Sequence, residues 1–265
     1  MLDVEFAQLS DPGRVRGHNE DYLGHALPAT PEQVQSHGFL FVVADGVGGQ
    51  DLGEVASRTA VESVLGGFRA APKSEPLLTM LPRLIQTANA KILETAHTGS
   101  RNSGMATTVV ACALRFDRAV VAHVGDSRCY LIRHGHAVPL TRDHTYANEQ
   151  ARLGILTSRE AAEAPTRHVL SRSLGGDMFV NVDVSEHQVY AGDVLLLCSD
   201  GLHGPVAASD IARITSNGAD LEDAVQGLIQ LANQRDGGDN VSVQAVRVRG
   251  VERVGMYRGR PYKLR

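Results

Sequence analysis

The sequence predicts one large domain of mixed α-helix and antiparallel β-sheet. Short apolar strands follow one another between residues 107 and 140, and the turns between them are only two or three residues long. Such close spacing favours an antiparallel meander. Before the meander, residues 54–68 and 75–97 each carry one apolar stripe at helical spacing, so each helix is expected to cover one face of a sheet. A chain of 265 residues can bury a core of that size.

The composition narrows the class of protein. With 43% hydrophobic and 21% charged residues, the chain is typical of a globular domain. A net charge of −4 argues against general binding to nucleic acids or membrane surfaces. The first residues lack the pattern of a signal peptide, and no apolar run is long enough to span a bilayer, so we expect a cytoplasmic protein. The expected buried, reduced thiols are Cys112, Cys129 and Cys198.

The stretch from Phe39 to Ser57 organises the rest of the chain. It opens with six apolar residues, which predict a strand buried on both faces, and this strand ends on Asp45. A helical pattern begins soon afterwards. The glycines in between are Gly46, Gly48, Gly49 and Gly53. A buried strand therefore delivers one carboxylate into a loop whose backbone bends freely and can approach a ligand closely.

A second apolar strand, 194–198, ends in the same way, with Asp200 and Gly201. One Asp-Gly pair after a strand is usually only a turn, so the case for chemistry depends on the other acids. Several more lie at strand ends or in turns. The full set is Glu20, Asp21, Asp45, Asp126, Asp200 and Asp239.

Gathered carboxylates repel one another unless they are protonated, paired with cations or bound to metal. A set of oxygen ligands suits Mg²⁺ or Mn²⁺ rather than Zn²⁺. Two such ions, roughly 3.5–4 Å apart, would hold a bridging water as hydroxide. Arg16, in the loop before Glu20, offers a planar guanidinium for a phosphoryl oxygen. This combination indicates hydrolysis of a phosphate ester.

The order of the motifs resembles that of the metal-dependent protein phosphatases, the PPM or type 2C family, in their bacterial form. The resemblance covers roughly residues 5–248. Any one motif is weak, but eight in the same order are specific. The motifs are RGHNED at 16–21, ADGVGG at 44–49, GEVAS at 53–57, GMATT at 104–108, VGDSRCY at 124–130, LTRDH at 140–144, CSDGL at 198–202 and GDNVSV at 238–243.

The resemblance implies a role for each of the matched residues. Asp45 would bridge two metal ions, and the carbonyl of Gly46 would bind one of them. The first metal site would be completed by Asp200 and Asp239. Glu20 would act through water on the second ion, Asp126 would bind a weaker third ion, and Arg16 would hold the substrate phosphate. The implied fold is an α/β sandwich of two antiparallel sheets packed face to face, with helices outside and the metals at one end.

One position departs from part of the family. Some members carry a histidine directly after the first Asp-Gly, proposed as the general acid, whereas this chain has Val47. A proton for the leaving serine or threonine oxygen must then come from another group. A metal-bound water and His144 are both candidates.

The resemblance also divides the chain. Residues 1–250 would form the phosphatase domain, with a mobile flap at about 145–170, and residues 251–265 would form a basic C-terminal tail. We expect a monomer that acts on phosphorylated proteins, with no nucleic-acid or membrane partner. Bacterial members usually oppose a serine/threonine kinase of the eukaryotic-like type, so such a kinase is the expected partner. The expected enzyme is a protein serine/threonine phosphatase, a phosphoric monoester hydrolase.

Other kinds of site fit the sequence less well. Cys112 and Arg118 have the C-x5-R spacing of cysteine phosphatases, but no glycine lies between them to cradle a phosphate. The glycines from Gly46 onward fail the dinucleotide-binding pattern, because Asp51 stands where the third glycine belongs. A non-catalytic phosphoprotein-binding module on the same fold is the serious alternative. Such a module should have lost metal-binding acids, and this chain has all of them.

Overall fold

The computed structural model describes residues 2–47, 52–98, 104–216 and 220–251, and the backbone of 254–257 and 260–263. Gly48 and Gly49 of the glycine-rich loop, Asp51 and the side chains of residues 252–265 lie outside the described residues. The strands are β1 (Asp3–Asp11), β2 (Asp21–Ala26), β3 (Phe39–Val47), β4 (Ala106–Thr107), β5 (Val109–Arg115), β6 (Arg118–Val124), β7 (Arg128–Arg133), β8 (His136–Pro139), β9 (Asp183–Gln188), β10 (Val194–Cys198), β11 (Val241–Gly250), β12 (Val254–Tyr257) and β13 (Arg260–Lys263). The helices are α1 (Pro31–Ser36), α2 (Leu52–Ala70), α3 (Leu77–Thr98), α4 (Tyr146–Arg152), α5 (Ser158–Glu163), α6 (Asp200–His203), α7 (Ala208–Ser216) and α8 (Leu221–Arg235).

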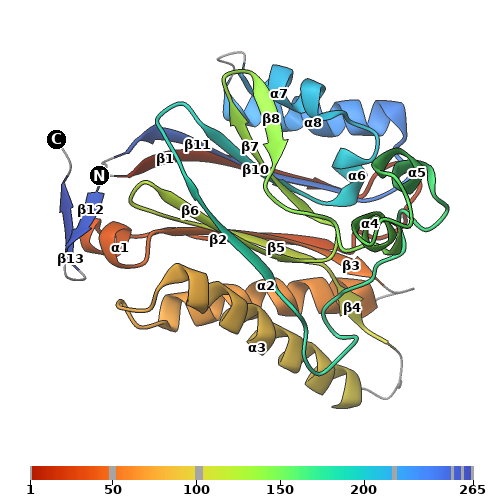
Figure 1. The fold of residues 1–265 in the computed structure, drawn as a ribbon, viewed down its shortest axis with the longest axis horizontal. Helices are drawn as coiled ribbons and strands as arrows, with labels where there is room; N and C mark the ends of the chain where they lie inside the picture. Colours follow the sequence, from red (N-terminus) through yellow and green to blue (C-terminus); the bar gives the residue numbers. More distant parts are fainter. Residues whose placement is uncertain are drawn as a thin grey trace.

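Two antiparallel sheets pack face to face, with helices on both outer sides (Figure 1). One sheet has the strand order β1-β11-β10-β7-β8, and the other has the order β2-β3-β5-β6-β9 with β4 paired to β3. Helices α2 and α3 cover the second sheet, and α7 and α8 cover the first. The predicted sandwich is therefore confirmed. Among the described helices, none is long and apolar enough to cross a membrane.

The central strand β3 shows why the sequence builds this layered core. Leu40, Val42 and Ala44 point to the side of α2 and α3, where they join one apolar cluster. Phe41 and Val43 point the other way, into the cluster between the two sheets. All five are fully buried. Because side chains alternate along a strand, a continuous apolar run is what a strand buried on both faces requires.

The expected single meander is wrong at one point. Strands β5 and β6 pair in one sheet, whereas β7 and β8 pair in the other. The chain crosses between the sheets at residues 125–127, where Gly125 has a φ of +102°. A Cβ at this glycine would lie 2.6 Å from the Cβ of Thr108, so a side chain does not fit there. This crossing places Asp126 at the end of the sandwich instead of in a hairpin turn.

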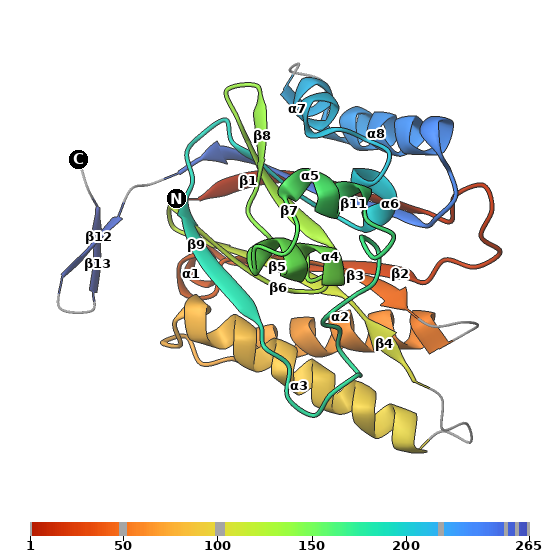
Figure 2. The same cartoon turned by 45° about the vertical axis from the view of Figure 1, so that its right-hand side comes forward.

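The segment expected to be a flap contains α4 and α5, and Figure 2 shows both beside α6 at one end of the sandwich. The two ends of this segment are hydrogen-bonded to each other through the backbone. Tyr146 N donates to Val169 O (2.9 Å), and Ser171 N donates to His144 O (2.8 Å). Near the C-terminus, β12 and β13 form a separate two-stranded antiparallel sheet.

Candidate active site

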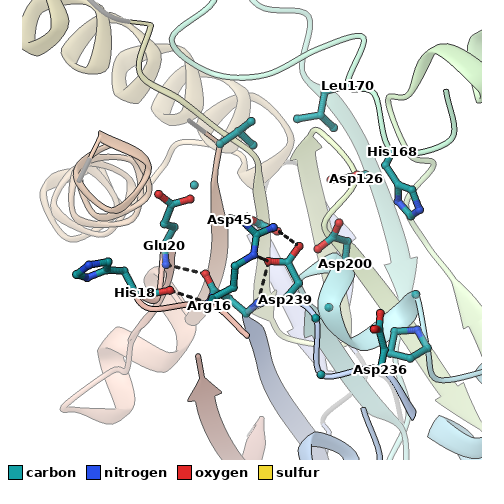
Figure 3. A pocket seen from close by; sticks show the side chains of 18 of the residues that line it. Arg16, His18, Glu20, Asp45, Asp126, His168, Leu170, Asp200, Asp236 and Asp239 are labelled. Atoms are coloured by element: carbon teal, nitrogen blue, oxygen red, sulfur yellow. Dashed lines mark hydrogen bonds and ion pairs between the residues drawn. The ribbon is translucent and has the colours of Figure 1, made fainter. Parts of the chain in front are cut away.

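The predicted acids meet at one end of the sandwich, around an open cavity of about 1000 Å³ (Figure 3). They come from the ends of several elements: the start of β2, the end of β3, the β6–β7 crossing, the start of α6 and the loop before β11. The predicted residues that line the cavity are Arg16, Glu20, Asp45, Gly46, Asp126, Asp200 and Asp239. The structure thus brings together every residue for which a metal-binding or phosphate-binding role was predicted, but not His144, the candidate proton donor. The individual roles remain predictions.

Asp45 is held in place by two threonines of the GMATT motif. Thr108 donates its backbone N–H to Asp45 O (2.8 Å), and Thr107 Oγ1 donates to the same carbonyl (2.7 Å). In return, Asp45 N donates to Thr108 Oγ1 (3.0 Å), which is also within 2.7 Å of Ser127 Oγ. The backbone on both sides of the Asp45 Cα is therefore fixed, and its carboxyl can meet a ligand without reorganisation.

Gly46 lies where two other segments approach the loop closely. A Cβ at this position would lie 2.3 Å from Gly53 O and 2.7 Å from Glu20 O, so only glycine fits. The Glu20 backbone is anchored on the opposite side, since its N–H donates to Asn240 Oδ1 (2.8 Å) and its carbonyl accepts from Ser57 Oγ (2.6 Å). These contacts explain why the RGHNED, GEVAS and GDNVSV motifs occur together.

Asp200 begins the one-turn helix α6, which the sequence did not predict. The adjoining Gly201 packs against the loop of the last motif, since a Cβ there would lie 2.0 Å from Asn240 O. This contact draws the Asp200 segment and the Asp239 segment together at the cavity. The strands behind them, β10 and β11, are direct antiparallel neighbours.

Arg16 already pairs with one of the acids. Its Nε lies 3.0 Å from Asp239 Oδ1 and its NH2 lies 3.0 Å from Asp239 Oδ2, a bidentate geometry that leaves other N–H groups of the guanidinium unused. Hydrogen bonding to Asp239 raises the pKa of Arg16. Both side chains are about half exposed. Arg16 is the only arginine or lysine among the described residues lining the cavity.

One arginine does not neutralise this group of acids. Burial, followed by the charge of Asp21, raises the pKa of Asp45 well above its usual range. Burial and the charge of Asp239 raise the pKa of Asp200, and burial raises the pKa of Asp126 to about 7. These raised pKa values mean that the ionised form of each carboxyl group is disfavoured when no cation is bound. A bound cation would reverse this preference.

Asp21 gives an independent test of whether the site fits a cation. The side chain is 5% exposed, and its Oδ2 accepts a hydrogen bond from Ser199 Oγ (2.7 Å). The other oxygen, Oδ1, is buried with no hydrogen-bond partner. Burial raises the pKa of Asp21 to about 7. An unsatisfied buried carboxylate oxygen beside several other carboxylates fits oxygen-preferring divalent cations with their bound waters.

Two ionisable side chains that line the cavity lie outside the predicted motifs and were missed by the sequence analysis. His168 comes from the flap, and Asp236 from the end of α8. The only signal for His168 in the sequence was its place within the predicted flap. Val47 stands where some members of the resembled family have histidine, and it also lines the cavity.

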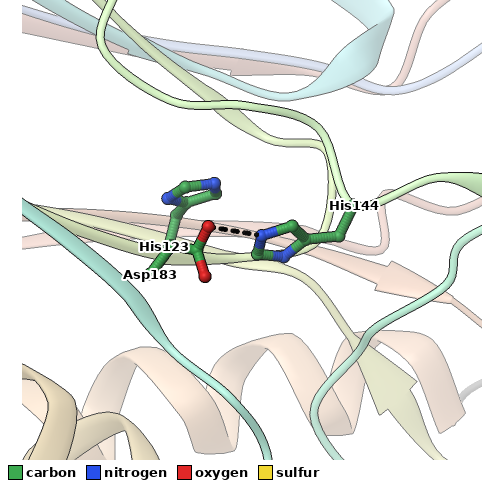
Figure 4. A group of neighbouring side chains, drawn as sticks. All are labelled: His123, His144 and Asp183. Carbon is green, nitrogen blue, oxygen red and sulfur yellow. Dashed lines mark ion pairs between the residues drawn. The ribbon is translucent and has the colours of Figure 1, made fainter. Parts of the chain in front are cut away.

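His144 does not line the cavity. It is 1% exposed and stacks on His123, with 4.6 Å between the ring centroids (Figure 4). Its Nδ1 accepts from Gly125 N (3.2 Å), so in the neutral ring Nε2 carries the hydrogen and faces Asp183 Oδ2 at 3.3 Å. Burial lowers the pKa of His144, which favours this neutral form. The structure therefore argues against His144 as the source of the leaving-group proton.

The group of His123, His144 and Asp183 is nevertheless a set of metal-ligand types, with donor atoms within 4.8 Å of one another. A positively charged side chain, that of Arg172, already lies among these residues. Arg172 NH1 lies 3.0 Å from Asp183 Oδ1 and 3.2 Å from His144 Nε2. The same guanidinium reaches Glu149 on α4 at 3.2 Å. This arrangement links the flap to the sheet, and the arginine supplies the positive charge that an ion would otherwise bring.

The structure also shows why Cys112 and Arg118 do not form a cysteine-phosphatase site. Cys112 is fully buried inside β5, while Arg118 begins β6, so no phosphate-binding loop joins them. All three cysteines are buried and free, as predicted.

Comparison with known proteins gives a consistent result. Residues 18–240 match the family model described as protein phosphatase 2C. The chain is 34% identical over 240 residues to the serine/threonine phosphatase Stp of Listeria innocua, an alignment covering 89% of this chain and 93% of the relative. A solved serine/threonine phosphatase of S. agalactiae superposes with a TM-score of 0.84 at 34% identity, covering 93% of this chain and all of the other.

A second solved structure bears on the cofactor. The catalytic domain of the serine/threonine protein phosphatase PstP, in complex with two manganese ions, superposes with a TM-score of 0.79 at 31% identity. That alignment covers 94% of this chain and 99% of the other.

Proposed function

The chain belongs to the protein phosphatase 2C family and is a serine/threonine protein phosphatase of the bacterial type, and we propose that it uses two divalent cations, Mn²⁺ or Mg²⁺, held by the acids of the cavity. The proposed ligands of the first ion are Asp45, Asp200 and Asp239. For the second ion they are Asp45 and, through water, Glu20, while the carbonyl of Gly46 would bind one of the two ions. Asp126 would bind a weaker third ion.

A single observation carries this proposal. Six carboxyl groups line one cavity, and the only arginine or lysine among the described lining residues is Arg16. The pKa of Asp45 is raised chiefly by burial and then by Asp21, and the pKa values of Asp126 and Asp200 are raised as well. A protein that keeps so many acids together, with one buried oxygen unsatisfied, is built for cations that bind oxygen. The manganese-bound PstP structure supports the same reading.

When bound, such ions would activate a water molecule as the nucleophile. The rest of the chemistry depends on the chain itself. The guanidinium of Arg16 would bind a phosphoryl oxygen at the mouth of the cavity, exchanging part of its contact with Asp239 for the substrate. The two threonines behind Asp45 hold its backbone N–H and carbonyl, which fixes the point from which the carboxyl reaches into the cavity. Val47 has no proton to give, so the leaving oxygen must be protonated by another group.

We further propose that the substrates are phosphoserine and phosphothreonine in proteins, and that the enzyme opposes a bacterial serine/threonine kinase of the eukaryotic-like type. The names of the relatives support the amino-acid specificity. A cytoplasmic location is supported by three unpaired, buried thiols, which suit a reducing compartment. We propose a monomer with a catalytic domain at 1–250, a flap at about 145–170 and a basic tail at 251–265.

The proposal is tested with purified protein stripped of metal by EDTA and then dialysed. Hydrolysis of a phosphothreonine peptide should be absent, and should return with Mn²⁺ or Mg²⁺. Full activity after rigorous chelation, verified by elemental analysis, would exclude the two-metal reading. The kinase relationship is tested separately, by comparing the phosphoproteomes of a deletion strain, its parent and a strain complemented with Asp45→Asn. Phosphosites that accumulate in the deletion and in the Asp45→Asn strain are the expected substrates.

A further inference from the structure

The cavity must hold a phosphate dianion next to many acids, so N–H donors are needed at its mouth. Four described residues lining the cavity have side-chain N–H groups. They are Arg16, His18, His168 and Asn240. Which of them can still bind a ligand is decided by their other contacts.

Asn240 is already used by the protein. Both hydrogens of its amide are committed, since Nδ2 donates to Pro12 O (3.0 Å) and to His18 O (3.0 Å). The ring of His18 lies on the Glu20 side of the site in Figure 3, away from Asp239 and Asp200. This leaves Arg16 and His168 as the side-chain donors that can face a bound phosphate.

His168 lies across the cavity from Arg16, on the side of Asp126 and Asp200 (Figure 3). Its side chain is exposed, and no described residue forms a hydrogen bond with its ring. His168 and Asp200 both line the cavity.

The flap holds the backbone beside His168 in a defined position. The next residue, Val169, accepts a hydrogen bond from Tyr146 N (2.9 Å), and Leu170 forms a β-bridge with Thr145. On the preceding side, Arg167 N donates to Ala164 O (3.1 Å). Four residues later, Arg172 ties the flap to Asp183 and Glu149. A donor carried by such a braced turn is preorganised for binding.

We propose that His168 is a substrate-binding residue, whose imidazole donates a hydrogen bond to the phosphate monoester from the flap, opposite the guanidinium of Arg16. This inference rests on the proposed phosphatase function and adds a second side-chain donor to the phosphate site. It also gives the flap a chemical role: when the flap is in place, the phosphate has a donor on both sides of the cavity.

The test compares three variants of the full chain with Mn²⁺ bound. His168→Ala and His168→Leu remove the N–H donor, whereas His168→Gln keeps one. Loss of a hydrogen bond to a charged group should raise KM on the order of tenfold to a hundredfold for both an aryl phosphate and a phosphothreonine peptide. Competitive inhibition by inorganic phosphate should weaken by a similar factor. His168→Gln should stay near the wild type in all three measurements.

Matched controls separate this inference from the function on which it rests. His136→Ala changes an exposed histidine on β8 that does not line the cavity, and should change nothing. The rise in melting temperature produced by Mn²⁺ should be the same in all variants. A wild type without metal-dependent activity would refute the proposed function itself. With an active wild type, unchanged phosphate inhibition in His168→Ala and His168→Leu would overturn the role of His168, and so would a KM effect confined to the peptide.

Discussion

Asp21 lies directly opposite Asp45 in the antiparallel register of β2 and β3. Both belong to strands whose other residues build the core; Asp21 is buried and Asp45 is half-buried. Asp21 Oδ2 is held by Ser199, the residue before Asp200, so this pair also connects the two sheets. The site is therefore built on adjoining strands, and its charges are destabilising until a cation binds.

The contribution of two buried acids to the stability of the metal-free protein should fall as pH rises. The pKa values of Asp21 and Asp126 are both raised to about 7 in the folded state by burial, from an ordinary value of 3.8. Their favourable contribution to folding is thus fully present below about pH 4 and is lost as pH rises through 7. Between those values each group should cost on the order of 1 kcal/mol per pH unit. Melting curves in EDTA from pH 5 to 8, compared between the wild type and Asp126→Ala, measure this slope for Asp126.

The same curves in Mn²⁺ provide the control. Metal binding needs ionised carboxylates, so the stabilisation by Mn²⁺ should grow with pH, and binding should release protons. Calorimetric titrations in two buffers of different ionisation enthalpy would detect that release. A pH dependence in EDTA that is the same in the wild type and in Asp126→Ala would contradict the predicted electrostatics.

Arg16→Ala should separate substrate binding from metal binding. The arginine pairs with Asp239 on an exposed edge of the cavity, so its loss should raise KM about tenfold or more with a smaller loss of kcat. Stabilisation by Mn²⁺ should be intact or larger, because Asp239 no longer shares its charge with a guanidinium. Arg14→Ala is the matched control, since this neighbouring arginine does not line the cavity. A loss of Mn²⁺ stabilisation in Arg16→Ala would show that the arginine supports the metal site instead.

Asp126→Ala tests the third-ion role. The residue lies at the crossing between the two sheets, and its buried carboxyl faces the cavity. Removal of a carboxyl whose pKa burial raises to about 7 should increase the stability of the metal-free protein at pH 8. Turnover should decrease while two ions still bind tightly, as measured by calorimetry alongside kcat. Unchanged turnover in a correctly folded variant would contradict the third-ion role and would show that Asp126 only shapes the turn.

The sequence was most informative where one strand decides both the fold and the site. An apolar run that ends on an acid, as at Asp45 and Asp200, predicts a buried strand and a carboxylate at its end. Local patterns could not show that the short turn at 125–127 crosses between sheets, because a hairpin and a crossing both use Gly-Asp-Ser. The correct position of Asp126 depends on long-range pairing of β7 with β10.

The polar flap was the least predictable part. Periodicity carries little information between residues 145 and 182, and the placement of His168 depends on backbone bonds to 145–146. The same limitation made His144 a candidate proton donor, although it is buried against His123 and paired with Asp183. Burial of a polar residue depends on its tertiary partners, which the local pattern does not reveal.

The central claim is that Asp45 joins two cations in one catalytic site, and calorimetric titration of metal-free protein with Mn²⁺ tests it most directly. The wild type should bind two ions tightly. Asp45→Asn should lose tight binding of both, with kcat reduced by about a hundredfold or more, while its circular dichroism and its melting temperature in EDTA are preserved or improved. Two tightly bound ions and near-wild-type turnover in Asp45→Asn would contradict the account.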